Sequence, residues 1–122
     1  MKRFTAKRAA AIQKIGYLRI RCGDHRFIAV WVVVVDGRVF VRSWNDKPGG
    51  WYRAFRKESA GAILVGASEV AVRAVPVKSS RLIDAASEAY AVKYVTKANL
   101  KYVQGFRAAR RWRTTLELLS QP

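Results

Sequence analysis

The chain has 122 residues, of which 51% are hydrophobic, and it carries a net charge of +16. Its length fits one domain with a single core, and four tryptophans exclude a disordered basic tail. No apolar run reaches the roughly 18–20 residues of a membrane-spanning helix. A single cysteine, Cys22, excludes an intrachain disulfide and fits a reducing compartment. We therefore expect a cytoplasmic protein that contacts no membrane.

The positive charge comes from 24 lysines and arginines against eight aspartates and glutamates, and it is spread along the chain. Such a surface attracts polyanions, among them nucleic acid, phosphate-bearing cofactors and anionic lipid. The alternative is that the charge serves solubility alone, because net charge by itself specifies no partner.

Residues 1–16 are predicted to form an N-terminal helix with Thr5 as its N-cap. Their basic residues without an acid loosely resemble an organellar presequence. The apolar spacing of Ala6, Ala9 and Ile12 instead favours a helix that covers the end of a domain. A strand over 17–22 is expected to follow it.

Residues 27–44 predict a long β-hairpin. Asp36 and Gly37 lie between two runs of apolar, β-branched residues, and a type I′ turn needs positive φ at both positions. One face of the hairpin is then aliphatic, which suits a barrel interior; the other combines aromatic rings with arginine, and we expect a partner or a flat ligand to cover it. The two-residue turn sets the opposite pairs: Val35 with Arg38, Val33 with Phe40, and Trp31 with Arg42.

The remaining elements are short. Trp51, Tyr52 and Phe55 are expected to face inward on the helix that follows the hairpin, and Ser79 or Ser80 to cap a later helix. We predict one mainly β domain over 1–122, a barrel with flanking helices. In chain order, the elements after the hairpin are a loop over 45–50, a helix over 51–58, strands over 62–65 and 69–77, a helix over 81–97, a helix over 100–110 and a closing strand over 112–119.

Several motifs together resemble a bacterial domain-of-unknown-function family that is grouped with the flavin-binding split β-barrels, the pyridoxamine-phosphate-oxidase-like and deazaflavin-dependent nitroreductase-like proteins. The resemblance implies a split β-barrel of the FMN-binding type, a homodimer, and a flavin or deazaflavin at the subunit interface. It implies no particular reaction, because that family has no established one. The motifs are Trp31 with the valine run, Asp36 with Gly37, residues 40–43, 51–53 and 83–86, Tyr90, Lys93 with Tyr94, and residues 114–118.

The loop before the predicted helix over 51–58 is the candidate phosphate site. A phosphate needs cationic side chains and free backbone amides, and a glycine-rich turn that opens a helix supplies the amides. Asp46 argues against the site, and residues 48–50 could form a plain turn. The resemblance implies the same strand-to-helix connection. The candidate cofactor-binding residues are Arg42, Ser43, Lys47, Gly49, Gly50, Trp51 and Arg53.

The aromatic face of the hairpin is the candidate dimer interface, and its residues are Trp31, Val33, Phe40 and Trp44. Tryptophan and arginine are enriched at interface hot spots, and Trp31 opposite Arg42 could form a cation–π pair. The face could bury a second subunit, a flat ring system, or both. Dimer contact with no cofactor is the alternative.

Other chemistry is weakly indicated. Cys22 and His25 could pair across a turn as thiolate and imidazole, but one cysteine and one histidine exclude a standard zinc site, so no metal is expected. The first hypothesis is a flavin- or deazaflavin-dependent oxidoreductase, in which the cofactor carries the hydride chemistry. The alternative is a non-catalytic dimer that binds nucleic acid or another polyanion without sequence specificity. Its candidate residues are Arg107, Arg110, Arg111, Trp112 and Arg113, with Trp44 and Tyr102 as stacking surfaces.

Overall fold

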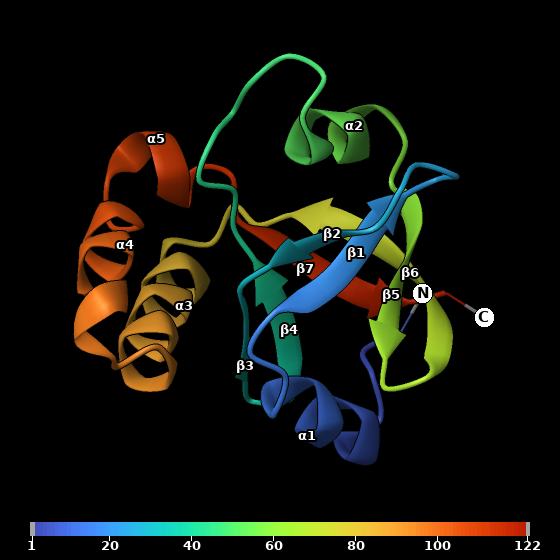
Figure 1. Ribbon diagram of the computed structural model, residues 1–122, viewed down its shortest axis with the longest axis horizontal. Coiled ribbons are helices and arrows are strands. Elements are labelled where there is room, and N and C mark those ends of the chain that lie inside the picture. Colours follow the sequence, from blue (N-terminus) through green and yellow to red (C-terminus); the bar gives the residue numbers. More distant parts are fainter. Residues whose placement is uncertain (1, 122) are drawn as a thin grey trace.

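The computed structural model describes residues 2–121, which form a seven-stranded antiparallel sheet with flanking helices (Figure 1). The order of the strands in the sheet is β2-β1-β5-β6-β7-β4-β3. The two outermost strands, β2 and β3, follow one another in the chain and are separated only by Trp31, so the sheet curls into a nearly closed barrel. The strands are β1 (Leu18–Cys22), β2 (Ile28–Val30), β3 (Val32–Val35), β4 (Arg38–Val41), β5 (Ala60–Val65), β6 (Ser68–Pro76) and β7 (Leu116–Ser120).

The central hairpin has the predicted turn and register. Asp36 and Gly37 have φ angles of 51° and 78°, as a type I′ turn requires. Opposite pairs in β3 and β4 are Val33 with Phe40 and Val35 with Arg38. The predicted single strand over 27–35 is wrong, however, because the chain bends at Trp31 and leaves the β1 partner for β4. Trp31 and Arg42 therefore lie outside the ladder, and their predicted pairing does not form.

The barrel interior is aliphatic, as the alternation of the hairpin predicted. Val32, Val39 and Val41 are fully buried there. The other strands contribute Leu18, Ile20, Ile63, Val72, Leu116 and Leu118.

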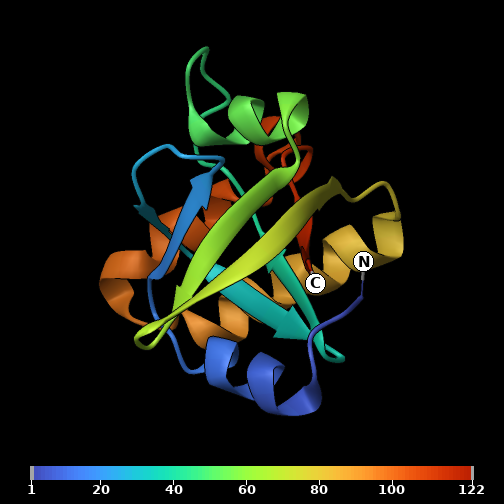
Figure 2. The ribbon, with the colours of Figure 1, turned by 90° about the vertical axis from the view of Figure 1, so that its right-hand side faces the viewer.

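Two helices cover the ends of the barrel (Figures 1 and 2). Helix α1 (Ala6–Gln13) begins at the predicted cap, where Thr5 Oγ1 accepts a hydrogen bond from the Arg8 amide at 3.2 Å. It inserts Ile12 into the core. Helix α2 (Trp51–Lys57) covers the opposite end and buries Tyr52 and Phe55, as predicted.

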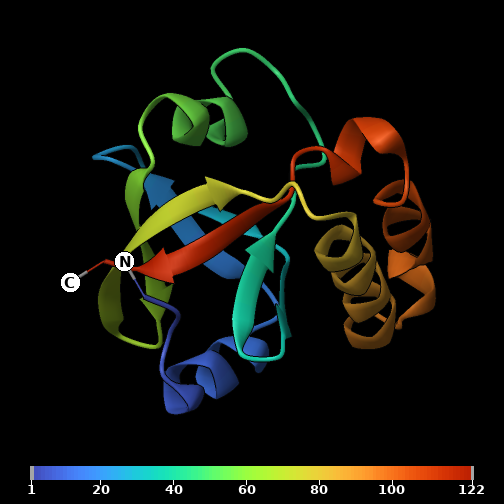
Figure 3. The same cartoon turned by 180° about the vertical axis from the view of Figure 1, so that it is seen from behind.

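The outer face of the β3–β4 hairpin is covered by helices of the same chain, which Figure 3 shows beside these strands. Helix α3 (Ser80–Lys93) is capped by Ser79 and packs on β3. A 3-10 turn, η1 (Lys97–Asn99), leads into α4 (Leu100–Gly105) and α5 (Ala109–Trp112). The predicted continuous helix over 100–110 breaks after Gly105, where the Phe106 carbonyl accepts a hydrogen bond from Arg42 instead of from the next helical turn. The predicted start of the closing strand at Trp112 is therefore too early.

Candidate functional site

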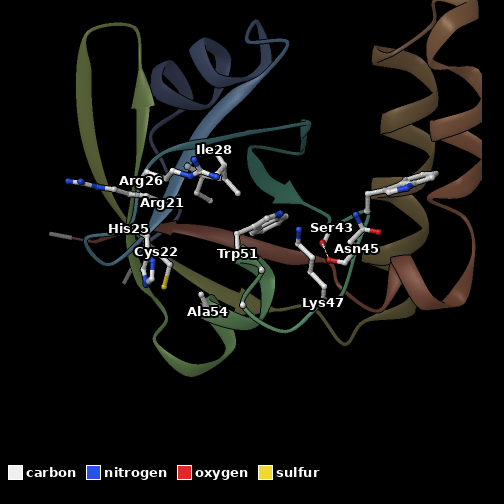
Figure 4. A pocket seen from close by; sticks show the side chains of 14 residues that line it. Arg21, Cys22, His25, Arg26, Ile28, Ser43, Asn45, Lys47, Trp51 and Ala54 are labelled. Atoms are coloured by element: carbon white, nitrogen blue, oxygen red, sulfur yellow. Dashed lines mark hydrogen bonds between the residues drawn. The ribbon is translucent and has the colours of Figure 1, made fainter.

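A cavity of about 360 Å³ lies between the β1–β2 turn, the loop after β4 and the start of α2. We call it the basic pocket, because Arg21, Arg26 and Lys47 line it and no carboxylate does. In Figure 4 the Lys47 side chain extends toward the space beside Trp51, while Arg21 and Arg26 lie across the pocket. The other lining residues are Ile20, Cys22, His25, Ile28, Ser43, Trp44, Asn45, Gly49, Gly50, Trp51 and Ala54.

The pocket presents positive charge to a ligand beside apolar and aromatic surface. Among the described residues, Arg21 is the only cation of the pocket wall that forms an ion pair. Its Nη2 lies 3.1 Å from Glu69 Oε2. That carboxylate is half exposed, so solvent screens the pair. Because three cations face no lining acid, the pocket favours an anion, and charge-assisted hydrogen bonds to phosphate are the strong kind.

Five of the seven predicted cofactor residues lie together in this pocket: Ser43, Lys47, Gly49, Gly50 and Trp51. The expectation that the Gly50 amide is free for a phosphate is wrong, because this amide donates to the Lys47 carbonyl at 3.0 Å and closes the turn. Gly49 has a φ of 77°, which explains why glycine stands there. The cations of the pocket, more than the turn amides, therefore define the site.

Arg53 does not line the basic pocket; it lines an adjoining cavity that shares Gly49, Gly50 and Ala54 with the pocket. Its Nε donates to Asp46 Oδ1 at 2.7 Å, and its Nη2 donates to the Asp46 carbonyl at 3.1 Å. This exposed pair also removes the objection that Asp46 raised, because the carboxylate has its own cation and does not line the basic pocket.

Arg42 has a different role from the predicted one. Its side chain is 2% exposed, and its guanidinium donates to Thr115 Oγ1, Ser87 Oγ and the carbonyls of Phe106 and Ile83 at 2.9–3.1 Å. Burial lowers the pKa of this guanidinium. Its contacts join the end of β4 to α3, α4 and the start of β7, so Arg42 holds the helical layer on the barrel.

The predicted dimer residues Val33 and Phe40 are not available to a second subunit. Both are fully buried beneath α3 and α4, because these helices of the same chain take the place of the expected partner. Trp31 and Trp44 keep part of their surface exposed.

Trp31 and Trp44 belong to a cluster of aromatic rings beneath α3 and α4. Trp31 stacks on Tyr94 with ring centroids 4.0 Å apart, and Tyr102 meets the Trp44 ring edge-on at 5.0 Å. The Tyr94 hydroxyl donates to the Gly16 carbonyl at 2.7 Å, and burial raises its pKa to about 12. The signal for this cluster is the spacing of four residues in the pairs Tyr90 with Tyr94 and Tyr102 with Phe106, which places each pair on one face of a helix.

A second cavity, of about 450 Å³, opens against this cluster. We call it the aromatic pocket. It adjoins the basic pocket, because Trp44 and Trp51 line both. Its other lining residues are Tyr17, Ala29, Val30, Trp31, Arg42, Asn99, Tyr102 and Phe106.

Cys22 and His25 do not form a catalytic pair in the described residues. The Cys22 thiol is buried and donates to the Glu58 carbonyl at 3.1 Å. Burial raises its pKa, so the reactive thiolate is disfavoured at neutral pH.

The basic residues of the last helical segment are partly used inside the fold. The Arg111 guanidinium lies 3.4 Å from the centre of the Trp44 ring and donates to the Trp44 carbonyl. Arg107 pairs with Glu88 at 3.0 Å. Arg110 and Arg113 remain exposed.

Residues 8–118 match the model of a family described as uncharacterized protein conserved in bacteria (DUF2255). The chain belongs to this family. The predicted membership of a bacterial family of unknown function is therefore confirmed. No curated protein matches this DUF2255 member.

Among solved structures, this DUF2255 member is similar to the conserved hypothetical protein Rv2991 from Mycobacterium tuberculosis. The two chains share 12% sequence identity with a TM-score of 0.65, over 98% of this chain and 81% of the other. At this identity the likeness shows the fold alone, and it supports the mainly β barrel with flanking helices.

Within residues 2–121, no helix combines the length and the apolar composition that crossing a membrane requires. These residues are the part of the chain that the structure describes. They also hold no group of three or more His, Cys, Asp or Glu side chains that could bind a metal ion.

Proposed function

We propose that the basic pocket binds the phosphate of a flavin nucleotide, either FMN or a deazaflavin, and that the protein is a flavin-dependent oxidoreductase. The observation that carries the proposal is a cavity lined by Arg21, Arg26 and Lys47, with no carboxylate and with the Trp44 and Trp51 rings in its wall. The resemblance of the sequence to flavin-binding split barrels supports the same assignment.

The residues of the pocket fit such a group. The three cations supply donors for the phosphate oxygens, and the tryptophan rings offer flat surface for a planar ring system. Ser43 and Asn45 add polar atoms at the side of Lys47 (Figure 4). When bound, the flavin would supply the hydride chemistry, and the protein would bind and orient it.

A titration with FMN, followed by flavin fluorescence, tests the proposal. Lys47→Ala should weaken binding by about 10- to 150-fold, since a charge-assisted hydrogen bond contributes about 1.5–3 kcal/mol. The matched control is Lys7→Ala, which removes the same charge from α1 at the opposite end of the barrel and should leave binding unchanged. Equal binding by wild type and Lys47→Ala, or binding by neither, would contradict the proposal.

We also propose that the protein is a homodimer, through a surface other than the one the sequence indicated. Five large apolar side chains of the described residues are exposed, and three of them, Val92, Val95 and Leu100, lie at the α3–α4 connection. Exposed apolar surface of this kind marks interfaces. We call these three residues the apolar patch; the other two, Tyr17 and Tyr102, line the aromatic pocket.

Sedimentation velocity at micromolar concentration tests the dimer. The wild type should sediment as a dimer and Val92→Glu as a monomer, because a carboxylate buried without a partner opposes association. Ala10→Glu adds the same charge to the exposed face of α1 and should leave the dimer intact. A monomeric wild type would contradict the proposal.

Non-specific binding of polyanions is the second candidate function. The observation that favours it is the excess of cations, since the four ion pairs within residues 2–121 engage four of the 24 lysines and arginines. Affinity for random-sequence duplex DNA should then fall with salt, with a slope near −0.9 per phosphate contacted. Replacing both Arg110 and Arg113 with serine should make that slope shallower. A preferred DNA sequence that survives at physiological salt would contradict non-specific binding.

A further inference from the structure

The wall of the aromatic pocket is mostly aromatic. Six of its ten lining residues are aromatic, and they come from separate segments of the chain. Trp31, Trp44, Tyr102 and Phe106 pack against one another, whereas Tyr17 is mostly exposed. A cavity of about 450 Å³ with a largely aromatic lining lies within the size range of small-molecule sites.

The same wall contains a buried positive charge. Arg42 lines the pocket, and its guanidinium carbon lies 5.9 Å from the centre of the Phe106 ring, which also lines it. All four hydrogen-bond acceptors of Arg42 are neutral, and none of the ion pairs within residues 2–121 includes it. Among the described residues, Asp84 forms no ion pair with Arg42. Water screens a buried charge poorly, so Arg42 imposes a positive potential on the cavity.

We propose that the aromatic pocket binds a planar aromatic carboxylate, as a site separate from the phosphate site of the basic pocket. The rings supply stacking surface for a flat molecule, and Arg42 supplies the charge that selects an anion. An aromatic lining can also hold a quaternary ammonium ion. Here Arg42 and the net charge of +16 oppose a cation.

The aromatic pocket lies beside the basic pocket, and this position indicates what the bound carboxylate does. Because Trp44 and Trp51 line both pockets, a carboxylate in the aromatic pocket lies next to whatever the basic pocket holds. If a flavin binds there, as proposed above, the aromatic acid is its substrate class. Binding of the acid does not itself depend on the flavin.

Titration of the wild-type protein with 2-naphthoate, followed by tryptophan fluorescence and calorimetry, tests the proposal. Tyr102→Ala should weaken binding by roughly 5- to 150-fold, the loss of one stacking ring. Tyr102 is partly exposed, so the fold should survive the change. Phe27→Ala is the control, since Phe27 lies in the β1–β2 connection and lines neither pocket. Equal binding by wild type and Tyr102→Ala would overturn the proposal.

The charge of the ligand is tested without altering Arg42, whose variants could fail to fold. 2-Naphthylmethylammonium has the same ring and the opposite charge, and it should bind at least about tenfold more weakly than 2-naphthoate. Equal or tighter binding of the ammonium probe would overturn the assignment of an anion, and absence of binding by both probes would overturn the site.

A competition experiment separates this site from the phosphate site. FMN should leave 2-naphthoate bound, and Lys47→Ala should lose FMN while it keeps 2-naphthoate. Failure of FMN to bind the wild type would contradict the flavin proposal alone. Displacement of 2-naphthoate by FMN would show one shared site and overturn the separate one.

Discussion

The two faces of the β3–β4 hairpin differ in where their packing partners come from. The inner face places Val32, Val39 and Val41 among aliphatic side chains of the other strands. The outer face packs Val33 and Phe40 against an aromatic layer that α3 and α4 supply. All five of these side chains are fully buried within one chain, so an aromatic face that looks unpartnered in the sequence can be covered from within the same chain.

The largest expected loss of stability comes from a change on the outer face of the hairpin. Arg42→Met removes four buried hydrogen bonds, so the free energy of unfolding should fall by about 3–5 kcal/mol. Urea unfolding followed by circular dichroism measures it. The control Arg21→Met breaks a half-exposed ion pair and should cost no more than about 1 kcal/mol. Similar losses in both variants would show that Arg42 does not hold the helical layer.

The next largest loss of stability is expected from a change on the inner face of the hairpin, inside the barrel. Leu118→Ala leaves a cavity between β4 and β6 inside the barrel, and the free energy of unfolding should fall by about 3 kcal/mol. Gln104→Ala, at an exposed position on α4, should cost little. Hydrogen exchange sharpens the comparison, because Leu118→Ala should lower protection throughout the barrel. If protection fell only in α3 and α4, the two faces would not be independent layers.

The features that the sequence predicts correctly depend on local chemistry. The Asp36–Gly37 turn, its register, the Thr5 cap and the Ser79 cap each follow from residues close together in the chain. The same holds for part of the basic pocket, since residues 43–51 form one continuous loop and helix start. Arg21 and Arg26 were missed as pocket residues, although the basic residues around the β1–β2 turn were a usable signal.

The features that the sequence could not predict depend on distant partners. From the sequence alone, Arg42 looks like a surface cation. In the fold it is surrounded by Ser87, Phe106 and Thr115, which lie 45, 64 and 73 residues further along the chain. The break after Gly105 has the same cause, because it follows from the bond between Arg42 and the Phe106 carbonyl. The bend at Trp31 depends on closure of the barrel. The alternation of apolar and polar residues within one strand gives no information about that closure.

A smaller loss of stability is expected when the contact between α4 and the loop after β4 is disturbed. A methyl group at Gly105 would lie 2.3 Å from Cη2 of Trp44, so Gly105→Ala forces the indole to move. We expect a loss of about 1–3 kcal/mol in the free energy of unfolding. Gly16→Ala is the control, since a Cβ there meets no atom within 4 Å. Equal losses in the two variants would mean that the Trp44 contact does not account for the effect.

The smallest expected effect is a pH dependence that belongs to the outer layer alone. The Lys93 ammonium donates to the Val32 carbonyl at 2.8 Å, and burial lowers the pKa of Lys93 to about 8. The folded protein therefore releases this proton more readily than the unfolded chain, in which a lysine titrates near its ordinary pKa of about 10.4. Between these two values Lys93 binds more protons in the unfolded state, so the contribution of Lys93 to stability rises with pH.

Urea unfolding of wild type and Lys93→Met at several pH values between 7 and about 10.5 isolates this contribution. The stability of the wild type relative to the variant should rise across pH 8 to 10.5 by on the order of 1 kcal/mol, because solvent screens a half-buried ammonium. The Cys22 thiol, whose pKa burial raises, and the Tyr94 hydroxyl, with its pKa at about 12, are present in both proteins, so their contributions cancel in the difference. A difference that stays flat with pH would mean that the bond to Val32 offsets the burial of Lys93 in full.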